Sequence, residues 1–187
     1  VPQLEMGQGI STLIPQVVAT ELGADWRRVA VEPAPVSGHY ANLALSAHWA
    51  ELWMPAFAGL AGDEPDGFLN RRHAQGLRFM ATADGMSLAA YEAPARHAAA
   101  SLRTLLCMAA AERWDADWQQ CEAVQGQVRY GTRKVGFGEL AAEAGALTPP
   151  DDPPLRANPA QESPLRIASG AKPDFPRLDL PSKVDGS

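Results

Sequence analysis

Positive charge, cysteine and long apolar runs are all scarce in this sequence. Its 187 residues include 16 Lys and Arg against 22 Asp and Glu, which gives a net charge of -6 and a pI near 5.2. A protein that binds the phosphate backbone of nucleic acid carries a basic stripe and a pI above about 9. Charges, His and Pro interrupt every apolar stretch, Leu43 to Leu60 included, before the roughly 18 residues that a bilayer-spanning helix needs. We therefore expect no nucleic-acid partner and no membrane span.

Side chains that bind metals or act as nucleophiles are also few. Cys107 and Cys121 cannot make a disulfide framework, and neither has a second Cys or a His at metal-ligand spacing. No two histidines form an i,i+4 or His-x-His pair, so we predict no metal held by protein ligands. The four histidines are His39, His48, His73 and His97. No Ser has the glycine flanks of a nucleophile elbow.

What remains is the composition of a folded domain. The chain is 46% hydrophobic and 20% charged, and a domain of this length buries roughly 70% of the surface that its unfolded chain exposes. The sequence starts at Val1 without an initiator Met, so we expect it to begin after processing or inside a longer reading frame.

Proline is concentrated at one end of the chain. Nine of the 16 prolines lie in the last 40 residues, where they argue against a regular helix or a central strand. We predict residues 148–187 to be a Pro-rich extended arm or linker. Several apolar residues suggest that parts of this arm dock on another surface; they are Leu165, Ile167, Phe175, Leu178 and Leu180.

Apolar spacing predicts the regular elements of residues 1–147. The expected helices cover 12–22, 88–114 and 138–147. The expected strands are 28–32 and two short patterns, 123–124 with 128–130 and then 134–137, joined by turns at Gly126 and Gly131. Ser11 is the expected N-cap of the first helix, and Pro94 should start or kink the second. The predicted fold class is α+β, with a small mixed sheet packed by helices.

A glycine-punctuated turn before the first helix is the most informative local feature. Gly7 and Gly9 let the backbone approach a ligand, and the helix N-terminus that follows offers N–H groups to an anion. The amide of Gln8 can both donate and accept a hydrogen bond. A plain tight turn explains the same residues.

A second turn of small residues, Asp84-Gly85-Met86-Ser87, precedes the long helix and can also present N–H and hydroxyl groups to phosphate. The carboxylate of Asp84 disfavours an anion there. From the residues alone, an Asx turn with Ser87 as N-cap explains this segment better.

Taken together, these segments resemble the large, molybdopterin-binding subunit of the molybdenum hydroxylases, the xanthine dehydrogenase and aldehyde oxidase family, and most closely its isoquinoline 1-oxidoreductase beta-subunit type. The resemblance follows the family's order over nearly the whole chain. It is carried by residues 5–9, 26–35, 40–42, 91–94, 109–114, 137–141 and 177–187.

The resemblance implies roles for both turns. Gly7, Gln8 and Gly9 would lie against the molybdopterin cofactor, with Gln8 hydrogen-bonded to it. The turn that matches Asp84, Gly85, Met86 and Ser87 usually reads Gly-Ser-Thr-Ser and contacts the dinucleotide part of the cofactor. Only Ser87 is kept here, and a carboxylate beside a pyrophosphate is repulsive unless it turns away or is neutralised.

The resemblance also implies an activity and partners. Residues 1–147 would be part of the molybdopterin-binding domain and 148–187 the link to the next domain of a longer subunit. That subunit would bind molybdenum–molybdopterin cytosine dinucleotide, pair with a small subunit carrying 2Fe-2S clusters, and oxidise an N-heterocycle or aldehyde with water as the oxygen source. The family's catalytic glutamate lies downstream, so we expect no catalytic residue in this chain, which should be inactive alone.

Two alternatives stay open at this point. The chain is also explained as an isolated binding or scaffold module that keeps the fold but has lost the cofactor, for which the altered turn at Asp84 is the reason. Relatives of this type are often exported with their cofactor, so we expect a periplasmic location, with a cytoplasmic one as the alternative.

Overall fold

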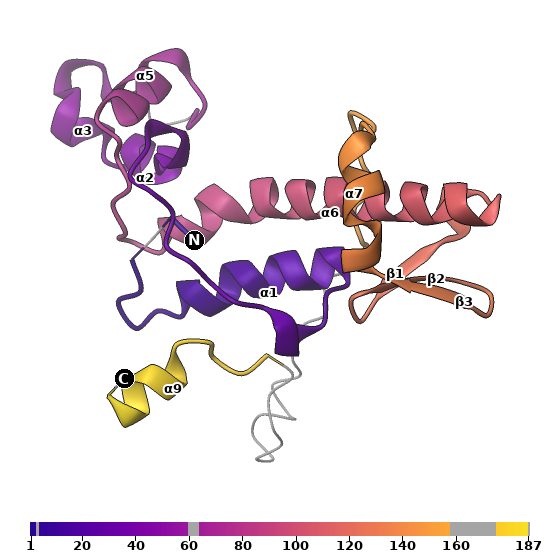
Figure 1. The fold of residues 1–187 in the computed structure, drawn as a ribbon. Coiled ribbons are helices and arrows are strands. Elements are labelled where there is room, and N and C mark those ends of the chain that lie inside the picture. The colour runs from indigo at the N-terminus through magenta and orange to yellow at the C-terminus, as the bar shows by residue number, and fades with distance from the viewer. Residues whose placement is uncertain (3, 60–63, 158–174, 187) are drawn as a thin grey trace. The chain divides into compact units, whose positions relative to one another are not determined.

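The computed structural model describes residues 1–2, 4–59, 64–157 and 175–186. Its α-helices are α1 (Ile10–Leu22), α2 (Leu43–His48), α3 (Ala50–Trp53), α5 (Phe68–Gly76), α6 (Met86–Trp114), α7 (Phe137–Ala146) and α9 (Leu180–Asp185) (Figure 1). Short 3-10 turns are η1 (Trp26–Arg28), η2 (Gly38–Tyr40), η3 (Pro55–Phe57) and η4 (Trp118–Gln120), and the strands are β1 (Glu122–Val124), β2 (Gln127–Tyr130) and β3 (Arg133–Gly136). The predicted α+β fold class is confirmed.

The chain divides into two compact units, each built from separate stretches of sequence. The first unit comprises Val1–Ile14, Val31–Ala93 and Arg177–Ser187; the second comprises Pro15–Ala30 and Pro94–Pro176. The division crosses α1 just before Pro15 and α6 just before Pro94, and both prolines lie inside their helices. A proline has no N–H to donate to the preceding turn, so each helix lacks one main-chain hydrogen bond there.

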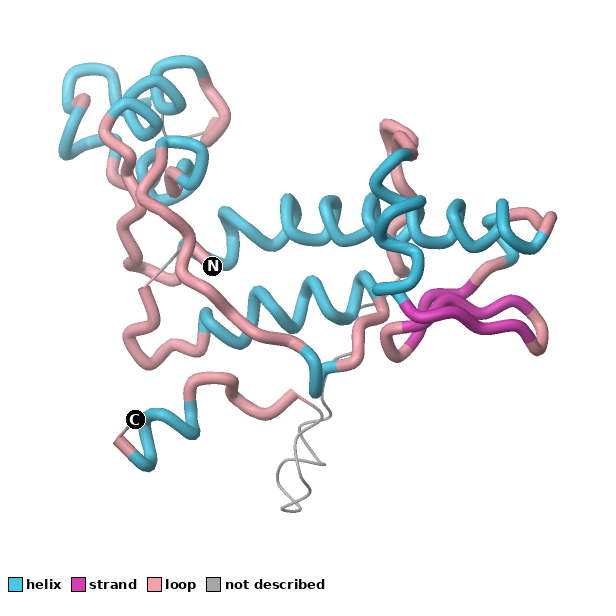
Figure 2. The backbone as a smooth tube through the Cα atoms, viewed as in Figure 1, coloured by secondary structure: helices cyan, strands magenta, loops and turns pink. Residues whose placement is uncertain are grey.

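The sheet belongs to the second unit and is a three-stranded antiparallel meander in the order β1-β2-β3 (Figure 2). Val128 on the central strand pairs with Ala123 on β1 and Val135 on β3. The β1–β2 turn places Gln125 and Gly126 at positive φ, as a two-residue hairpin requires. Both predicted strand patterns and their glycine turns are confirmed.

The core of the second unit lies between this sheet, α6 and α7. The three paired residues Ala123, Val128 and Val135 face the same side because directly opposite residues on neighbouring strands share one face of the sheet. They pack with Leu106 of α6 and Leu140 of α7, whose side chains are buried. Burying a side chain of this kind stabilises the fold by about 1.5–3 kcal/mol.

The first unit contains a group of short helices between residues 43 and 76. Asn42 caps α2 by accepting the N–H of Leu45, while its amide donates to the carbonyl of Ala81. Asn70 on α5 donates to the carbonyl of Leu43, so two buried amides hold these short helices together. Figure 1 shows α2, α3 and α5 gathered into one cluster.

Three predicted details of the sheet and the first helix are wrong. Residues 28–32 form no strand, and the sheet is antiparallel rather than mixed: Pro33 follows without an N–H, and the carbonyl of Glu32 accepts the Val1 amino group at 2.7 Å instead. The first helix begins at Ile10, where the carbonyl of Gly9 accepts two N–H groups, so Ser11 is not its N-cap.

Other predictions need smaller changes. The long helix begins at Met86, so Ser87 lies inside its first turn rather than at the N-cap. The Pro-rich stretch does contain a short helix, α9, because Pro181 lies in its first turn, where no N–H is needed. The docking residues Leu165 and Ile167 lie outside the described residues. The boundary between residues 147 and 148 stays a prediction.

Candidate functional site

The first predicted turn is built around the carboxylate of Glu5. Its Oε1 atom accepts the main-chain N–H groups of Gly7 at 2.8 Å and Gly9 at 2.9 Å, and its Oε2 atom accepts that of Ser11 at 3.0 Å. The N–H groups that we expected to bind an external anion are therefore already bound to the carboxylate of Glu5. Partial burial opposes ionisation of Glu5, but the donors at Gly9, Ser11 and Gly7 outweigh it and lower its pKa.

The side chain of Gln8 closes the same turn. Its Oε1 atom accepts the N–H of Met6 at 2.6 Å, and its Nε2 atom donates to the carbonyl of Leu4 at 2.9 Å. The second Nε2 hydrogen and the main-chain N–H of Gln8 have no partner among the described residues. Gly7 and Gly9 hold φ of 104° and 85°, which disfavour any side chain. Gln8 thus keeps two donors on an exposed, preformed turn.

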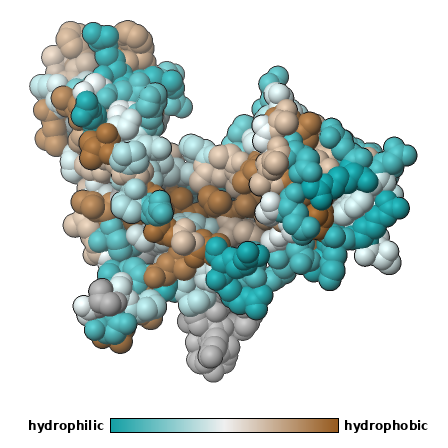
Figure 3. All heavy atoms as spheres, in the orientation of Figure 1, coloured by the Kyte–Doolittle hydropathy of each residue, from teal (hydrophilic) through white to brown (hydrophobic). Residues whose placement is uncertain are grey.

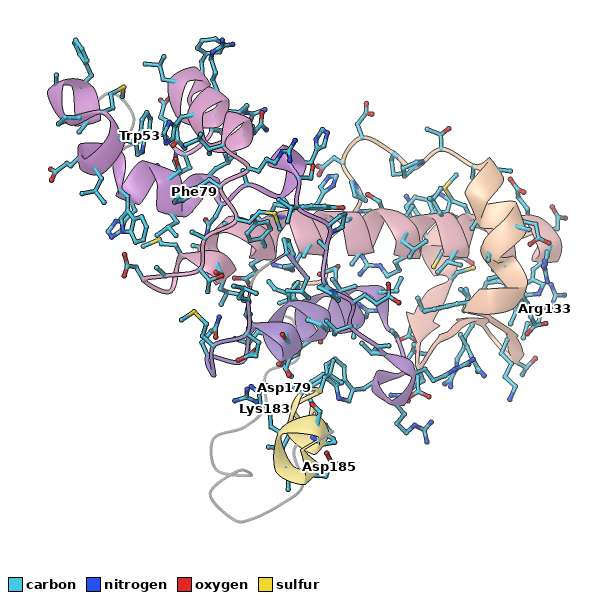
Figure 4. The ribbon with its side chains drawn as sticks, turned by 60° about the vertical axis from the view of Figure 1, so that its left-hand side comes forward. Trp53, Phe79, Arg133, Asp179, Lys183 and Asp185 are labelled. Atoms are coloured by element: carbon cyan, nitrogen blue, oxygen red, sulfur yellow. The ribbon has the colours of Figure 1, made fainter. Side chains whose placement is uncertain are left out.

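The end of the chain contacts this turn within the first unit. Arg177 donates from Nη1 to the carbonyl of Gly7 at 3.2 Å and from Nη2 to Oε1 of Glu5 at 3.3 Å. The same guanidinium binds Asp179 with two hydrogen bonds, at 2.9 and 2.7 Å. Asp179, just before α9, and Lys183, in the last turn of α9, lie beside each other (Figure 4) and form an ion pair.

The second predicted turn directs its carboxylate toward the helical cluster. Oδ2 of Asp84 accepts the indole N–H of Trp49 at 2.8 Å and lies 3.7 Å from Nε2 of His48. Asp84 and Gly85 have φ of 51° and 69°, which turn the backbone just before α6. The Asp84 carboxylate, which was expected beside a possible phosphate, therefore contacts the side chains of His48 in α2 and Trp49 just after it.

Ser87 follows in the first turn of α6 and is buried, with 4% of its surface exposed. Its hydroxyl has no hydrogen-bond partner among the described residues. An unpaired buried hydroxyl normally costs free energy, so such groups in native proteins call for an explanation such as an ordered water or a bound ion.

The structure places both turns in the first unit and joins them. The main-chain N–H of Leu4, beside the first turn, donates to Oγ1 of Thr82, beside the second, at 3.3 Å. A cavity of about 470 Å³ lined by Val29, Gly126 and Phe137, with others, lies in the second unit and contains none of the predicted site residues.

The described residues also include neither a metal-binding cluster nor a membrane-spanning helix. Over residues 1–2, 4–59, 64–157 and 175–186, no group of three or more His, Cys, Asp and Glu side chains could hold a metal ion. Within the same ranges, no helix is long and apolar enough to cross a membrane.

Comparison with known proteins tests the predicted resemblance. The chain is 29% identical over 217 aligned residues to the isoquinoline 1-oxidoreductase subunit beta of Brevundimonas diminuta. The alignment covers 99% of this chain and 23% of that protein. The predicted likeness to that beta subunit is confirmed. The chain is also 23% identical to a membrane-bound aldehyde dehydrogenase (pyrroloquinoline-quinone) of Gluconacetobacter polyoxogenes, over 98% of this chain and 19% of that protein. No family model matches.

The two relatives are much longer than this chain. The chain spans less than a quarter of the length of each of these two relatives. The first is named as an oxidoreductase subunit and the second as a dehydrogenase.

Three residues that hold the two turns were not predicted from the sequence; they are Glu5, Trp49 and Arg177. Glu5 opens the segment 5–9, and its carboxylate two residues before Gly7 is the available signal for a filled turn. Trp49 and Arg177 are 35 and 170 residues from the groups that they contact in Asp84 and Gly7, and no local spacing predicts such pairs.

Proposed function

We propose that this chain is part of the large subunit of a molybdenum hydroxylase that oxidises an N-heterocycle or an aldehyde, with water as the oxygen source. The observation that carries the proposal is the similarity to the isoquinoline 1-oxidoreductase beta subunit along 99% of the chain. The chain supplies two cofactor-contacting turns and no catalytic residue. The larger subunit, a small subunit with 2Fe-2S clusters and a periplasmic location belong to the same proposal.

The donor sets of the two turns fit different parts of molybdenum–molybdopterin cytosine dinucleotide. At the first turn, the two unused donors of Gln8 suit the acceptor edge of the pterin heterocycle better than a phosphate, since Glu5 already takes the neighbouring N–H groups. At the second turn, the Ser87 hydroxyl and the N-terminus of α6 suit the pyrophosphate. When bound, the molybdenum centre supplies the redox chemistry; this chain binds and orients the cofactor.

The direct test is to purify the protein from its source and measure molybdenum, released cytosine nucleotide and pyrroloquinoline quinone by mass spectrometry. The second relative is named for that quinone, so the measurement separates two cofactor classes. Stoichiometric molybdenum with cytosine nucleotide supports the proposal. A protein with neither cofactor supports the isolated scaffold module instead.

A variant test uses the unpaired hydroxyl of Ser87. Ser87→Ala removes no hydrogen bond that the described residues make, so it should leave stability unchanged or slightly raised. We expect it to reduce bound cytosine dinucleotide about tenfold, as the loss of one hydrogen bond to a charged group does. The matched control is Ser46→Ala, which removes another buried, unpartnered hydroxyl of the first unit. Equal cofactor content in both variants would contradict the role of Ser87.

A further inference from the structure

The glycine turn is held from two directions within the first unit. From inside, the Glu5 carboxylate accepts three N–H groups of residues 7–11. On its other side, the turn contacts the segment that begins at Arg177, near the other end of the sequence. The two sets of contacts meet at Oε1 of Glu5, which accepts from Gly7, Gly9 and Arg177.

Arg177 is suited to this position by its planar, five-donor head. Its Nε and Nη2 atoms bind the two carboxylate oxygens of Asp179, which fixes the plane of the guanidinium. Nη1 then reaches the carbonyl of Gly7, and Nη2 reaches Glu5. A lysine in its place would keep the charge but could not make these contacts together.

The neighbouring contacts keep this segment in place. The N–H of Leu178 donates to Oγ1 of Thr12, a buried side chain in the first turns of α1, at 3.0 Å. Hydrogen bonds from Arg177 and Lys183 hold the pKa of Asp179 well below its usual range, so the carboxylate stays charged at neutral pH. Its side chain is 14% exposed and that of Glu5 is 12% exposed, which limits screening by solvent.

We propose that Arg177 is a positioning residue for the Gly7–Gly9 turn: it holds the Glu5 carboxylate under the turn and the Gly7 carbonyl in place, so that Gln8 is presented in one conformation. The inference rests on the proposed function for its cofactor. It adds that residues some 170 positions apart form one binding element. Arg177 acts through Glu5 and Gly7 and is assigned no contact with the cofactor.

The test compares Arg177→Gln with Lys183→Gln in the complete purified protein. Both variants remove one positive charge that binds Asp179, but among the described residues no hydrogen bond or ion pair joins Lys183 to the turn. Hydrogen exchange followed by mass spectrometry is measured on peptides spanning residues 4–13, with residues 99–111 of α6 as the reporter of the overall fold. Cofactor content is measured on the same samples.

We expect Arg177→Gln to speed exchange of residues 4–13 about tenfold and to lower cofactor content, with residues 99–111 unchanged. Lys183→Gln should change neither quantity, and Arg177→Lys should restore only part of the protection. Unchanged exchange in Arg177→Gln would overturn the inference, and so would faster exchange with full cofactor retention. If Arg177→Gln does not fold, Asp179→Asn weakens the anchor of the guanidinium and should shift the same peptides in the same direction.

The two proposals fail separately. If the unmodified protein contains no molybdenum cofactor, the proposed function fails, and the exchange of residues 4–13 still decides whether Arg177 holds the turn. If the cofactor is present and Arg177→Gln leaves both measurements unchanged, the proposed function stands and the positioning role is overturned.

Discussion

Nη1 of Arg103 lies 2.6 Å from Oε1 of Glu21, a carboxylate that is completely buried in the second unit. The other carboxylate oxygen accepts Nε and Nη2 of Arg96 at 3.2 Å, and the main-chain N–H of Arg156 also donates to Oε1, at 2.8 Å. One carboxylate thus gathers three arginine residues from α6 and from the start of the Pro-rich stretch.

Replacing that carboxylate should be severely destabilising. Glu21→Gln leaves the guanidinium groups of Arg96 and Arg103 facing a neutral group in a buried position, and removing one partner of a buried ion pair costs about 3–5 kcal/mol. Urea unfolding followed by circular dichroism measures the loss. Glu143→Gln breaks the exposed pair with Arg113 and is the control, for which we expect little change. Equal effects of the two substitutions would contradict the structural importance of Glu21.

The second unit shows how far the sequence predicts the fold. Alternation around Val128 and the turn residues Gly126 and Gly131 identify the meander, because hairpin pairing is local and its turns have characteristic residues. Residues 28–32 have the same apolar character but form no strand, because no pairing partner is nearby in sequence and Pro33 follows. Apolar composition alone does not decide whether a segment finds a partner strand.

The candidate site follows the same rule. The sequence identified both turns, since glycines before an amphipathic helix are a local signal. It did not predict that Glu5 fills the first turn or that Trp49 engages Asp84, because a count of free N–H groups omits the side chains that fold back on them. Contacts over 35 and 172 residues depend on the tertiary fold and have no counterpart in local spacing.

Trp49 should influence cofactor binding through Asp84. Trp49→Phe removes the indole donor, which frees the carboxylate to turn toward a bound pyrophosphate, so we expect about tenfold weaker retention of cytosine dinucleotide. Asp84→Asn removes the charge and should not weaken retention. The double variant should recover the level of Asp84→Asn, a coupling that a double-mutant cycle measures. Additive losses in the double variant would refute this relation.

Acid should loosen the first turn before it unfolds the chain. The pKa of Glu5 is lowered because hydrogen bonds outweigh burial, and that of Asp179 is lowered by Arg177 and Lys183. Both contributions are present above the ordinary values of 4.5 and 3.8 and decline as the pH falls through the lowered pKa values. Exchange of residues 4–13, corrected for the intrinsic pH dependence, should therefore accelerate below about pH 4. Glu5→Gln should abolish the share of this pH-dependent acceleration that comes from protonation of Glu5.

The two cysteines should differ in reactivity. Burial is the main cause that raises the pKa of Cys107 to about 11, and it raises the pKa of the half-buried Cys121 as well. Because the thiolate is the reactive form, iodoacetamide at pH 8 should modify Cys121 first and leave Cys107 mostly free. Peptide mass spectrometry over a time course gives the order, and the two rates should become similar in 6 M guanidinium. Faster labelling of Cys107 in the folded protein would show that its burial is wrong.

Two glycine-to-alanine substitutions in the second unit should change the free energy of unfolding in opposite directions. Gly23 ends α1 at φ 79°, and a Cβ there would lie 2.2 Å from the carbonyl oxygen of Ala123, so Gly23→Ala must displace the backbone as well as strain it. We expect a loss above the roughly 1 kcal/mol that positive φ alone costs. Gly138, in the first turn of α7, has nothing within 4 Å of its Cβ position, so Gly138→Ala should stabilise by about 0.5 kcal/mol. Urea unfolding of both variants measures the contrast, and a neutral Gly23→Ala would mean that α1 does not end against β1 as described.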